Sequence, residues 1–285
     1  MVKLSFRLLK PARLGWLMAL LFGGAALLSA APQANYKLSG DGPLPIGGDV
    51  HSFELSANGL VTVYWASQET SDTIELFAAP TNGSQAPVRL SALPEQGRYI
   101  NEYAVSRDNA HVIYSADQDT RDVRELYSAP LDGSASPTKL SGAMVENGGL
   151  PLYSGGFKIS PDGHRVAYRA DQDTDEVFEL YSAPVDGSAA AVKLNAPLPA
   201  GGGTYGYEIS PANQYLLYTA NQDVDNVVGL YRVPLDGSAP PEQLSGALVA
   251  GGAVSYFKIS PDSMNVVYLA DQDTNDVSEL YTVPI

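Results

Sequence analysis

The sequence predicts an all-β fold, namely a five-bladed β-propeller of four-stranded antiparallel blades. A pattern of about 50 residues returns five times along the chain. Each copy divides into four short apolar segments separated by turn residues. No segment from Asn35 to Ile285 shows a sustained apolar period of 3.6 residues, which would indicate a helix. Together these observations favour blades that stack radially, because one blade cannot bury both of its faces alone.

Three markers recur in phase. An acidic loop begins at Ala66, Ala116, Ala170, Ala220 and Ala270, with starts 50, 54, 50 and 50 residues apart. The same spacing separates the Glu-Leu-Tyr segments that begin at Glu75, Glu125, Glu179, Gly229 and Glu279. It also separates the turns that begin at Ser56, Ser106, Ser160, Ser210 and Ser260. Three markers in one register establish an internal repeat.

The third copy shows how a blade is built. Pro161-Asp162-Gly163 is a tight turn, since proline presets φ and Asp and Gly tolerate the backbone. The four strands, a to d, are expected at 157–160, 165–169, 178–184 and 191–194. The blades are centred near 50–91, 100–141, 154–195, 204–245 and 254–285, the last completed by 35–39.

The end of the repeat predicts closure of the ring. The last copy stops after its strand c, and Asn35–Gly40 matches the strand d Thr138–Gly142 of the second copy. Tyr36–Ser39 is therefore expected to pair with Leu280–Pro284 and cover the open edge. The alternative is a piece of a larger ring.

Recurring aromatic residues predict the core. They lie at strand positions of every copy, which favours packing between blades over ligand stacking. Strand b carries Tyr64, Tyr114, Tyr168, Tyr218 and Tyr268, and strand c carries Phe77, Tyr127, Tyr181, Tyr231 and Tyr281.

Residues 1–30 read as a secretory signal peptide that precedes a single propeller domain at 31–285. Lys3, Arg7, Lys10 and Arg13 precede an apolar run from Leu14 to Leu28, and small residues follow. Cleavage is expected after Ala30 or Ala34. The alternative is a retained membrane anchor, but the run is short for a span, which needs about 20 apolar residues.

Removal of the signal leaves 13 basic against 32 acidic residues, a formal charge of −19. Such a surface repels nucleic acid and anionic lipid. It suits a periplasmic or secreted protein, without a membrane span after cleavage, that meets cations, basic proteins or neutral glycans. The chain has no cysteine, which excludes disulfides, thiolate metal sites and cysteine nucleophiles. We expect a monomer.

The blade pattern resembles a known repeat. Ile159-Ser160-Pro161-Asp162-Gly163, Val166-Ala167-Tyr168, Glu179-Leu180-Tyr181 and Val185-Asp186-Gly187 are similar to the TolB-type, WD40-like propeller repeat. The resemblance covers residues 36–285. It implies a β-propeller that is often periplasmic and serves protein–protein contact. TolB itself carries an α/β domain before a six-bladed ring, and the acidic connections here are longer than the usual tight turn.

Known catalytic patterns are missing from the sequence. His51, His111 and His164 have no metal-ligand spacing, and no Gly-x-Ser-x-Gly elbow occurs. The glycines of 201–203 lack the lysine and helix of a phosphate-binding loop.

The acidic loops between strands b and c are candidate calcium sites, because alternating carboxylates offer the oxygen ligands that Ca²⁺ prefers. The alternative is structural, since Asp and Asn cap tight turns. No loop has the glycine and glutamate of an EF-hand. The candidate ligands are Asp117, Asp119, Asp122, Asp171, Asp173, Asp175, Asp223, Asp225, Asp271, Asp273 and Asp276.

Strand a, innermost in a propeller, carries Glu54, Ala104, Lys158, Glu208 and Lys258 at matched positions. Glu54 and Glu208 are candidate channel carboxylates for a glycosidase, which needs two carboxyl groups about 5–9.5 Å apart. Lys158 and Lys258 are potential ion-pair partners for them. The sequence therefore favours a non-catalytic, exported binding scaffold in the cell envelope. Its expected partner is a protein, with a glycan or a divalent cation also open, and a carbohydrate-active enzyme is the alternative.

Overall fold

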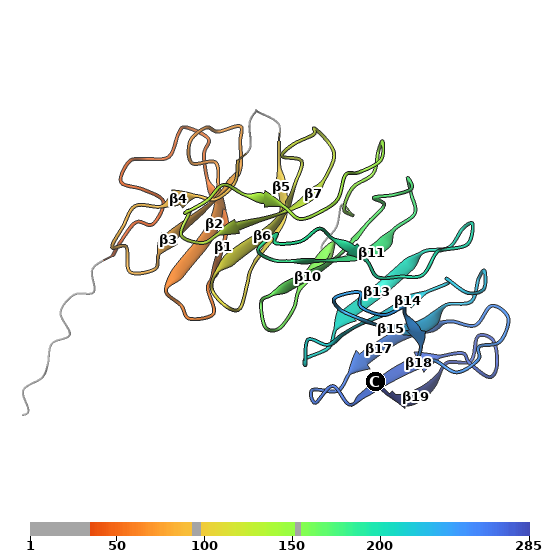
Figure 1. Ribbon diagram of the computed structural model, residues 1–285. Coiled ribbons are helices and arrows are strands. Elements are labelled where there is room, and N and C mark those ends of the chain that lie inside the picture. Colours follow the sequence, from red (N-terminus) through yellow and green to blue (C-terminus); the bar gives the residue numbers. More distant parts are fainter. Residues whose placement is uncertain (1–34, 93–97, 152–154) are drawn as a thin grey trace, which may run out of the picture. The chain divides into compact units, whose positions relative to one another are not determined.

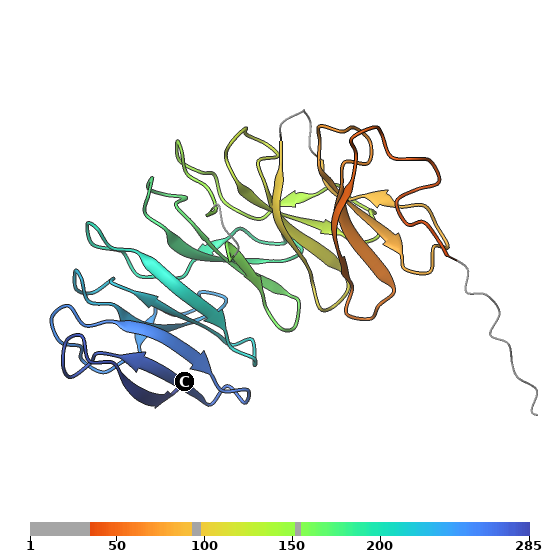
Figure 2. The same cartoon turned by 180° about the vertical axis from the view of Figure 1, so that it is seen from behind.

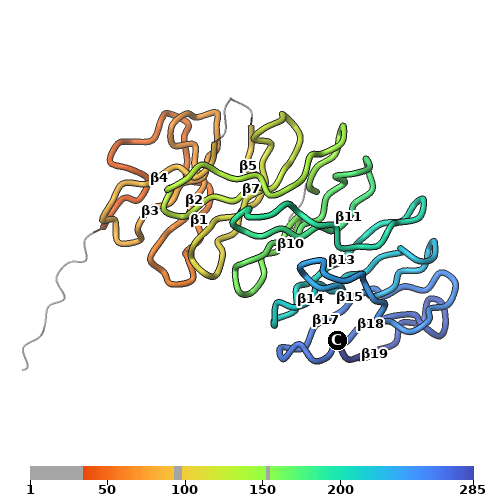
Figure 3. Tube along the Cα trace, in the orientation of Figure 1, coloured from red at the N-terminus to blue at the C-terminus, as the bar shows by residue number. Residues whose placement is uncertain are grey.

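The computed structural model describes residues 35–92, 98–151 and 155–285 (Figure 1). These residues form five antiparallel sheets and no helix, so none of them lies in a helix that could cross a membrane. Tyr36–Ile285 is one compact unit. The predicted signal peptide lies outside the described residues. Figure 3 shows the sheets following one another in chain order.

Each of the first four sheets is a four-stranded meander. Their strands are β1 (Val50–Leu55), β2 (Val61–Ala66), β3 (Glu75–Pro80), β4 (Val88–Arg89), β5 (Ile100–Val105), β6 (His111–Ala116), β7 (Glu125–Pro130), β8 (Thr138–Lys139), β9 (Phe157–Ile159), β10 (Arg165–Ala170), β11 (Glu179–Pro184), β12 (Val192–Lys193), β13 (Thr204–Ile209), β14 (Tyr215–Ala220), β15 (Gly229–Pro234) and β16 (Glu242–Gln243). The fifth sheet has three strands, β17 (Val254–Ile259), β18 (Asn265–Ala270) and β19 (Glu279–Pro284).

The turn between the first two strands of a sheet follows from its sequence. In the third sheet Ser160 Oγ donates to Asp162 Oδ1 at 2.5 Å, and the same oxygen accepts the His164 N–H at 3.0 Å. Gly163 has φ +82°, which costs a residue without Cβ little. These contacts reverse the chain in a tight turn, as the Pro-Asp-Gly sequence predicts.

The recurring aromatic residues form the core of each sheet, as predicted. Tyr168 and Tyr181 stack with ring centroids 5.3 Å apart, and the other four sheets stack the matching pair at 5.4–5.5 Å. All ten rings except Tyr281 are buried. Burial raises the pKa of Tyr64 to about 12, and the pKa values of its counterparts Tyr114, Tyr168 and Tyr218 are raised for the same reason.

Neighbouring sheets are joined by a leucine that follows each short fourth strand. Leu90, Leu140 and Leu194 are buried in clusters shared with the following sheet, and Leu244 packs against the cluster of the fifth sheet. Figure 2 shows the same succession of sheets from behind. Each sheet thus supplies part of the core of the next sheet. We call Leu90, Leu140, Leu194 and Leu244 the anchor leucines.

The predicted closure of the ring is not confirmed. Tyr36–Ser39 forms no strand with β19, and the fifth sheet remains three-stranded. Leu38 instead packs against Tyr64 and Phe77 of the first sheet, and its carbonyl accepts the Tyr64 hydroxyl at 3.2 Å. Leu38 therefore occupies on the first sheet the place that an anchor leucine occupies on each later sheet.

Candidate functional site

The five matched positions of the first strands have the register that the repeat predicts. Glu54 pairs with Val63, and Ala104, Lys158, Glu208 and Lys258 pair with the matching residues of β6, β10, β14 and β18. The sequence alignment of the copies is therefore the structural alignment. Side chains that differ between copies at matched positions can be compared directly.

The two candidate channel carboxylates have different partners. Glu208 accepts a hydrogen bond from Lys158 at 2.8 Å in a half-exposed ion pair. Glu54 lies in the first sheet and accepts the Val105 N–H at 3.3 Å. Burial raises the pKa of Glu54, although that hydrogen bond lowers it. The raised pKa suits a proton donor, whereas the ion pair keeps Glu208 engaged by its neighbour.

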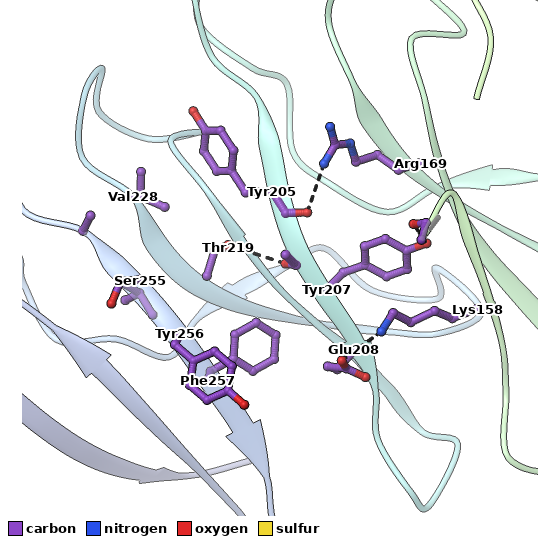
Figure 4. A pocket seen from close by; sticks show the side chains of 14 residues that line it. Lys158, Arg169, Tyr205, Tyr207, Glu208, Thr219, Val228, Ser255, Tyr256 and Phe257 are labelled. Atoms are coloured by element: carbon purple, nitrogen blue, oxygen red, sulfur yellow. Dashed lines mark hydrogen bonds and ion pairs between the residues drawn. The ribbon is translucent and has the colours of Figure 1, made fainter. Parts of the chain in front are cut away.

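A cavity of about 530 Å³ lies along β9, β13 and β17, and we call it the inner-strand pocket (Figure 4). Lys158 of β9 and Arg169 of β10 both enter from the third sheet, and Glu208 of β13 lies beside Lys158. Tyr205, Tyr207, Tyr256 and Phe257 provide its aromatic surface. Its volume falls within the range of small-molecule sites, about 300–1,000 Å³.

Two tyrosines of the inner-strand pocket occupy variable positions of the repeat. Tyr205 is 45% exposed and Tyr256 is 54% exposed. The positions matching Tyr205 carry His51, Asn101, Gly155 and Ser255, and those matching Tyr256 carry Ser52, Glu102, Gly156 and Gly206. Tyrosines that recur are buried core, whereas these two occur once each and face solvent. The sequence contained this signal as two positions that vary from copy to copy, but the search for catalytic patterns missed it.

Arg169 occupies a third variable position, because the matching positions carry Trp65, Ser115, Thr219 and Leu269. Its guanidinium lies 4.8 Å from the Phe178 ring centroid and donates to the Tyr205 carbonyl at 3.4 Å. The Nε of Arg169 is buried without a hydrogen-bond partner among the described residues. Burial lowers the pKa of Arg169. The guanidinium therefore bonds to the backbone of β13 at the edge of the pocket. It also adds a positive charge to the pocket lining.

In the last four loops, the Asp or Asn that follows the opening alanine caps the backbone. Asp171 accepts the Gly149 N–H at 2.6 Å and the Glu176 N–H at 3.1 Å. Asp117 and Asp271 each accept two backbone amides in the same way, and Asn221 accepts the Gly203 N–H. The two amide bonds lower the pKa of Asp271. These contacts tie each loop to the connection that precedes its sheet.

In the same four loops, the aspartate two positions further on faces the sheet. Asp119 and Asp173 form ion pairs with Lys139 at 3.0 Å and Lys193 at 2.6 Å. Asp223 and Asp273 accept the hydroxyls of Tyr231 and Tyr281. The third carboxylates, Asp122, Asp175, Asp225 and Asp276, are exposed.

Within 35–92, 98–151 and 155–285, no three acidic or imidazole groups gather closely enough to hold a metal ion. Calcium binding stays a prediction with a direct measurement. Millimolar Ca²⁺ should raise the melting temperature beyond the effect of matched ionic strength. Replacing Asp171, Asp173 and Asp175 by Asn should reduce that increment, and scanning calorimetry without a calcium-specific shift would leave backbone capping and ion pairing as the roles of these groups.

No protein-family model matches the chain, and no curated protein sequence matches it. Solved structures do. A TolB-like protein of Agrobacterium tumefaciens is 17% identical with a TM-score of 0.44, over 83% of this chain and 77% of that one. A puromycin-hydrolyzing peptidase of Mycobacterium tuberculosis is 16% identical with a TM-score of 0.47, over 83% of this chain and 36% of the peptidase.

An oligogalacturonate lyase solved with manganese is 10% identical with a TM-score of 0.50, over 85% of this chain and 67% of the lyase. Identities this low concern the fold and not the activity. The five repeated antiparallel sheets, with the sequence pattern that builds them, give the chain a β-propeller type of fold.

Proposed function

We propose that the chain is an exported, non-catalytic binding scaffold whose ligand occupies the inner-strand pocket. The observation that carries the proposal is the gathering around one cavity of Tyr205, Tyr256 and Arg169, which occupy three variable positions of the repeat. A repeat conserves what its scaffold needs in every copy. Side chains that occur once, at the same place and partly exposed, support a role in recognition.

Of the partner classes that the sequence leaves open, the pocket favours a glycan. Exposed tyrosine rings present flat, apolar faces with a polar edge, which suit the alternating apolar and hydroxyl faces of a sugar ring. Lys158, Glu208, Thr219 and Ser255 add donors and acceptors to the lining. A protein partner inserting one side chain into the pocket is the alternative, and it is favoured if no glycan of the panel below binds.

The test is binding of the purified mature chain to a panel of neutral and acidic glycans, followed by calorimetry on the best ligand. Tyr205→Ala and Tyr256→Ala should each weaken binding by about tenfold, since aromatic residues dominate such contacts. Tyr99→Ala is the matched control, because Tyr99 is 53% exposed and does not line the pocket. Equal losses in all three variants, or no glycan bound at all, would contradict the proposal.

The glycosidase alternative is favoured by one observation, the raised pKa of Glu54. The same glycans are therefore also assayed for release of reducing sugar. The scaffold predicts binding without turnover for the natural chain and for both variants. Glu54→Gln, outside the pocket, should leave the affinity unchanged, whereas Glu208→Gln should lower it because Glu208 lines the pocket. Turnover that either substitution abolishes would make the chain an enzyme.

Export is tested at the N-terminus. The mature protein recovered from the periplasm or medium should begin at Ala31 or Asn35, as read by mass spectrometry of the intact chain. Recovery of residues 1–30 in a membrane fraction would support the retained anchor instead.

A further inference from the structure

The last sheet exposes apolar side chains at positions that are buried in every other sheet. Leu280 is 70% exposed, while its counterparts Leu76, Leu126, Leu180 and Leu230 are 0% exposed. Val267 is 39% exposed, while the matching Val63, Ile113, Ala167 and Leu217 are also 0% exposed. These counterparts are buried because a following sheet packs on them. The fifth sheet therefore presents a face built to be covered.

The first sheet has the complementary exposure on its other face. Phe53 is 68% exposed, whereas the matching Phe157, Tyr207 and Phe257 are 5%, 6% and 8% exposed. Leu55, at 50%, is exposed beside it. A largely apolar cavity of about 370 Å³ lies there, lined by these two residues together with Leu38, Val50 and Tyr64 among others.

The two open faces match the two sides of an internal seam. Between the first and second sheets, Val63 and Leu76 share one buried cluster with Val105, Val112 and Tyr114. Val267 and Leu280 occupy the positions of Val63 and Leu76 in the fifth sheet. Leu55, Thr62 and Tyr64 occupy the positions of Val105, Val112 and Tyr114 in the first sheet. The fifth face therefore fits the first by the same side-chain packing.

Charge gives an independent match. In the first three sheets a glutamate of the third strand pairs with a base of the fourth, as in Arg89–Glu75, Lys139–Glu125 and Lys193–Glu179 at 2.6–3.2 Å. The fourth sheet has Gly229 and Gln243 at these positions, so it lacks both the glutamate and the base.

The fifth sheet keeps the acids without a base. Glu279 and Asp273 both accept the Tyr281 hydroxyl, and neither meets a basic side chain of the described residues. The base at the matching position of Tyr36–Ser39 is Lys37, which here donates to the Gly42 carbonyl. Lys37 is therefore the base that Glu279 and Asp273 of the fifth sheet lack, but its segment packs on the first sheet.

We propose that this chain binds a second copy of itself head to tail through these two faces. The fifth sheet of one copy packs its Leu280 and Val267 into the apolar cavity of the next copy. There Tyr36–Ser39 pairs with β19 as its fourth strand, and Lys37 meets Glu279 and Asp273. An open strand edge and two unlike complementary faces are what a heterologous contact between copies requires.

The second copy is the occupant because one chain does not satisfy its own faces. Four internal seams join the five sheets, and after them both end faces are still exposed and share no core cluster among the described residues. This proposal replaces the expectation of a monomeric closed ring.

Charge reversal with complementation in trans tests it. Lys37→Glu and Glu279→Lys each place like charges at every junction between identical chains. Each variant alone should associate at least about tenfold more weakly than the natural chain in sedimentation equilibrium. An equimolar mixture of the two should regain association, because every junction between unlike chains pairs opposite charges. Arg121→Glu and Asp225→Lys are matched reversals in exposed loops outside the two faces, and they should leave association unchanged.

Three results overturn the proposal. The first is a natural chain that stays monomeric over a wide range of concentration. The second is a monomer whose β19 amides are protected from hydrogen exchange, which shows closure within one chain. The third is association that the mixture does not restore although both variants keep the circular dichroism and melting behaviour of the natural chain.

Discussion

At the scale of single residues, Asp171 satisfies two backbone amides with one carboxylate. Asp171→Ala leaves the Gly149 and Glu176 N–H groups without their partner, one of them buried. The free energy of unfolding should fall by about 2–3 kcal/mol, the cost of unsatisfied buried donors. Asp171→Asn should cost less, because Asn221 caps the same place in the fourth sheet. Equal losses in urea denaturation for the two variants would show that the amide contacts do not stabilise the fold.

Glu176 has φ +62°, a left-handed conformation that residues with a Cβ adopt at a cost. Glu176→Gly should therefore raise the free energy of unfolding by up to about 1 kcal/mol. The adjacent Asp175 has no positive φ, so Asp175→Gly should lower stability through the entropy of the unfolded chain. Thermal denaturation of the pair isolates the backbone effect, and the same sign for both substitutions would refute it.

At the scale of elements, the stacked aromatic pair is the repeated unit of the core. Tyr181 is buried, and its loss in Tyr181→Ala should cost about 3–5 kcal/mol. Its counterpart Tyr281 lies in the three-stranded last sheet and is half-buried. Tyr281→Ala should cost clearly less in dilute protein, and the difference should narrow under conditions where chains associate. Denaturation at two protein concentrations measures both effects.

The strands themselves were predictable from the sequence, because apolar alternation and turn residues recur in register five times. The third and fourth strands of the third copy, expected at 178–184 and 191–194, are Glu179–Pro184 and Val192–Lys193. The pairing of Tyr36–Ser39 with β19 was not found. A sequence match shows that this segment resembles a fourth strand, but it does not show which of two neighbours the segment contacts.

The candidate site was predicted only in part. Lys158 was expected as a partner of the channel glutamates, and it pairs with Glu208. Tyr205 and Tyr256 were not singled out, because a consensus draws attention to what recurs. Their exposure depends on β13 and β17 lying side by side, a property of the assembled sheets.

At the scale of the whole molecule, buried phenols and paired lysines make the fold sensitive to alkali. Burial raises the pKa of Tyr114, Tyr168 and Tyr181 above the ordinary 10.0. Desolvation lowers the pKa of Lys193, but its bonds to Asp173 and Glu179 outweigh this and raise it above 10.5. A pKa raised in the folded state stabilises below the unfolded value, and the contribution is lost as pH rises through the folded value.

Stability should therefore hold up to about pH 10 and fall steeply above it. Denaturation followed from about pH 8 to pH 11, with phenolate absorbance recorded in parallel, should show the buried tyrosines ionising together with unfolding. Gradual ionisation of all tyrosines in a folded chain would contradict the burial described above.

The anchor leucines have a consequence for how the gene can change. Each one is carried by one sheet and packs into the core of the next, so every junction has the same two halves. The copies are most often 50 residues apart, so a gene segment of 50 codons encodes one anchor leucine and one surface that receives an anchor leucine, wherever the segment begins. Tandem duplication or deletion of such a segment rebuilds both flanking junctions without any compensating substitution. Recombination between copies can therefore lengthen or shorten this protein by whole sheets while its core chemistry stays unchanged.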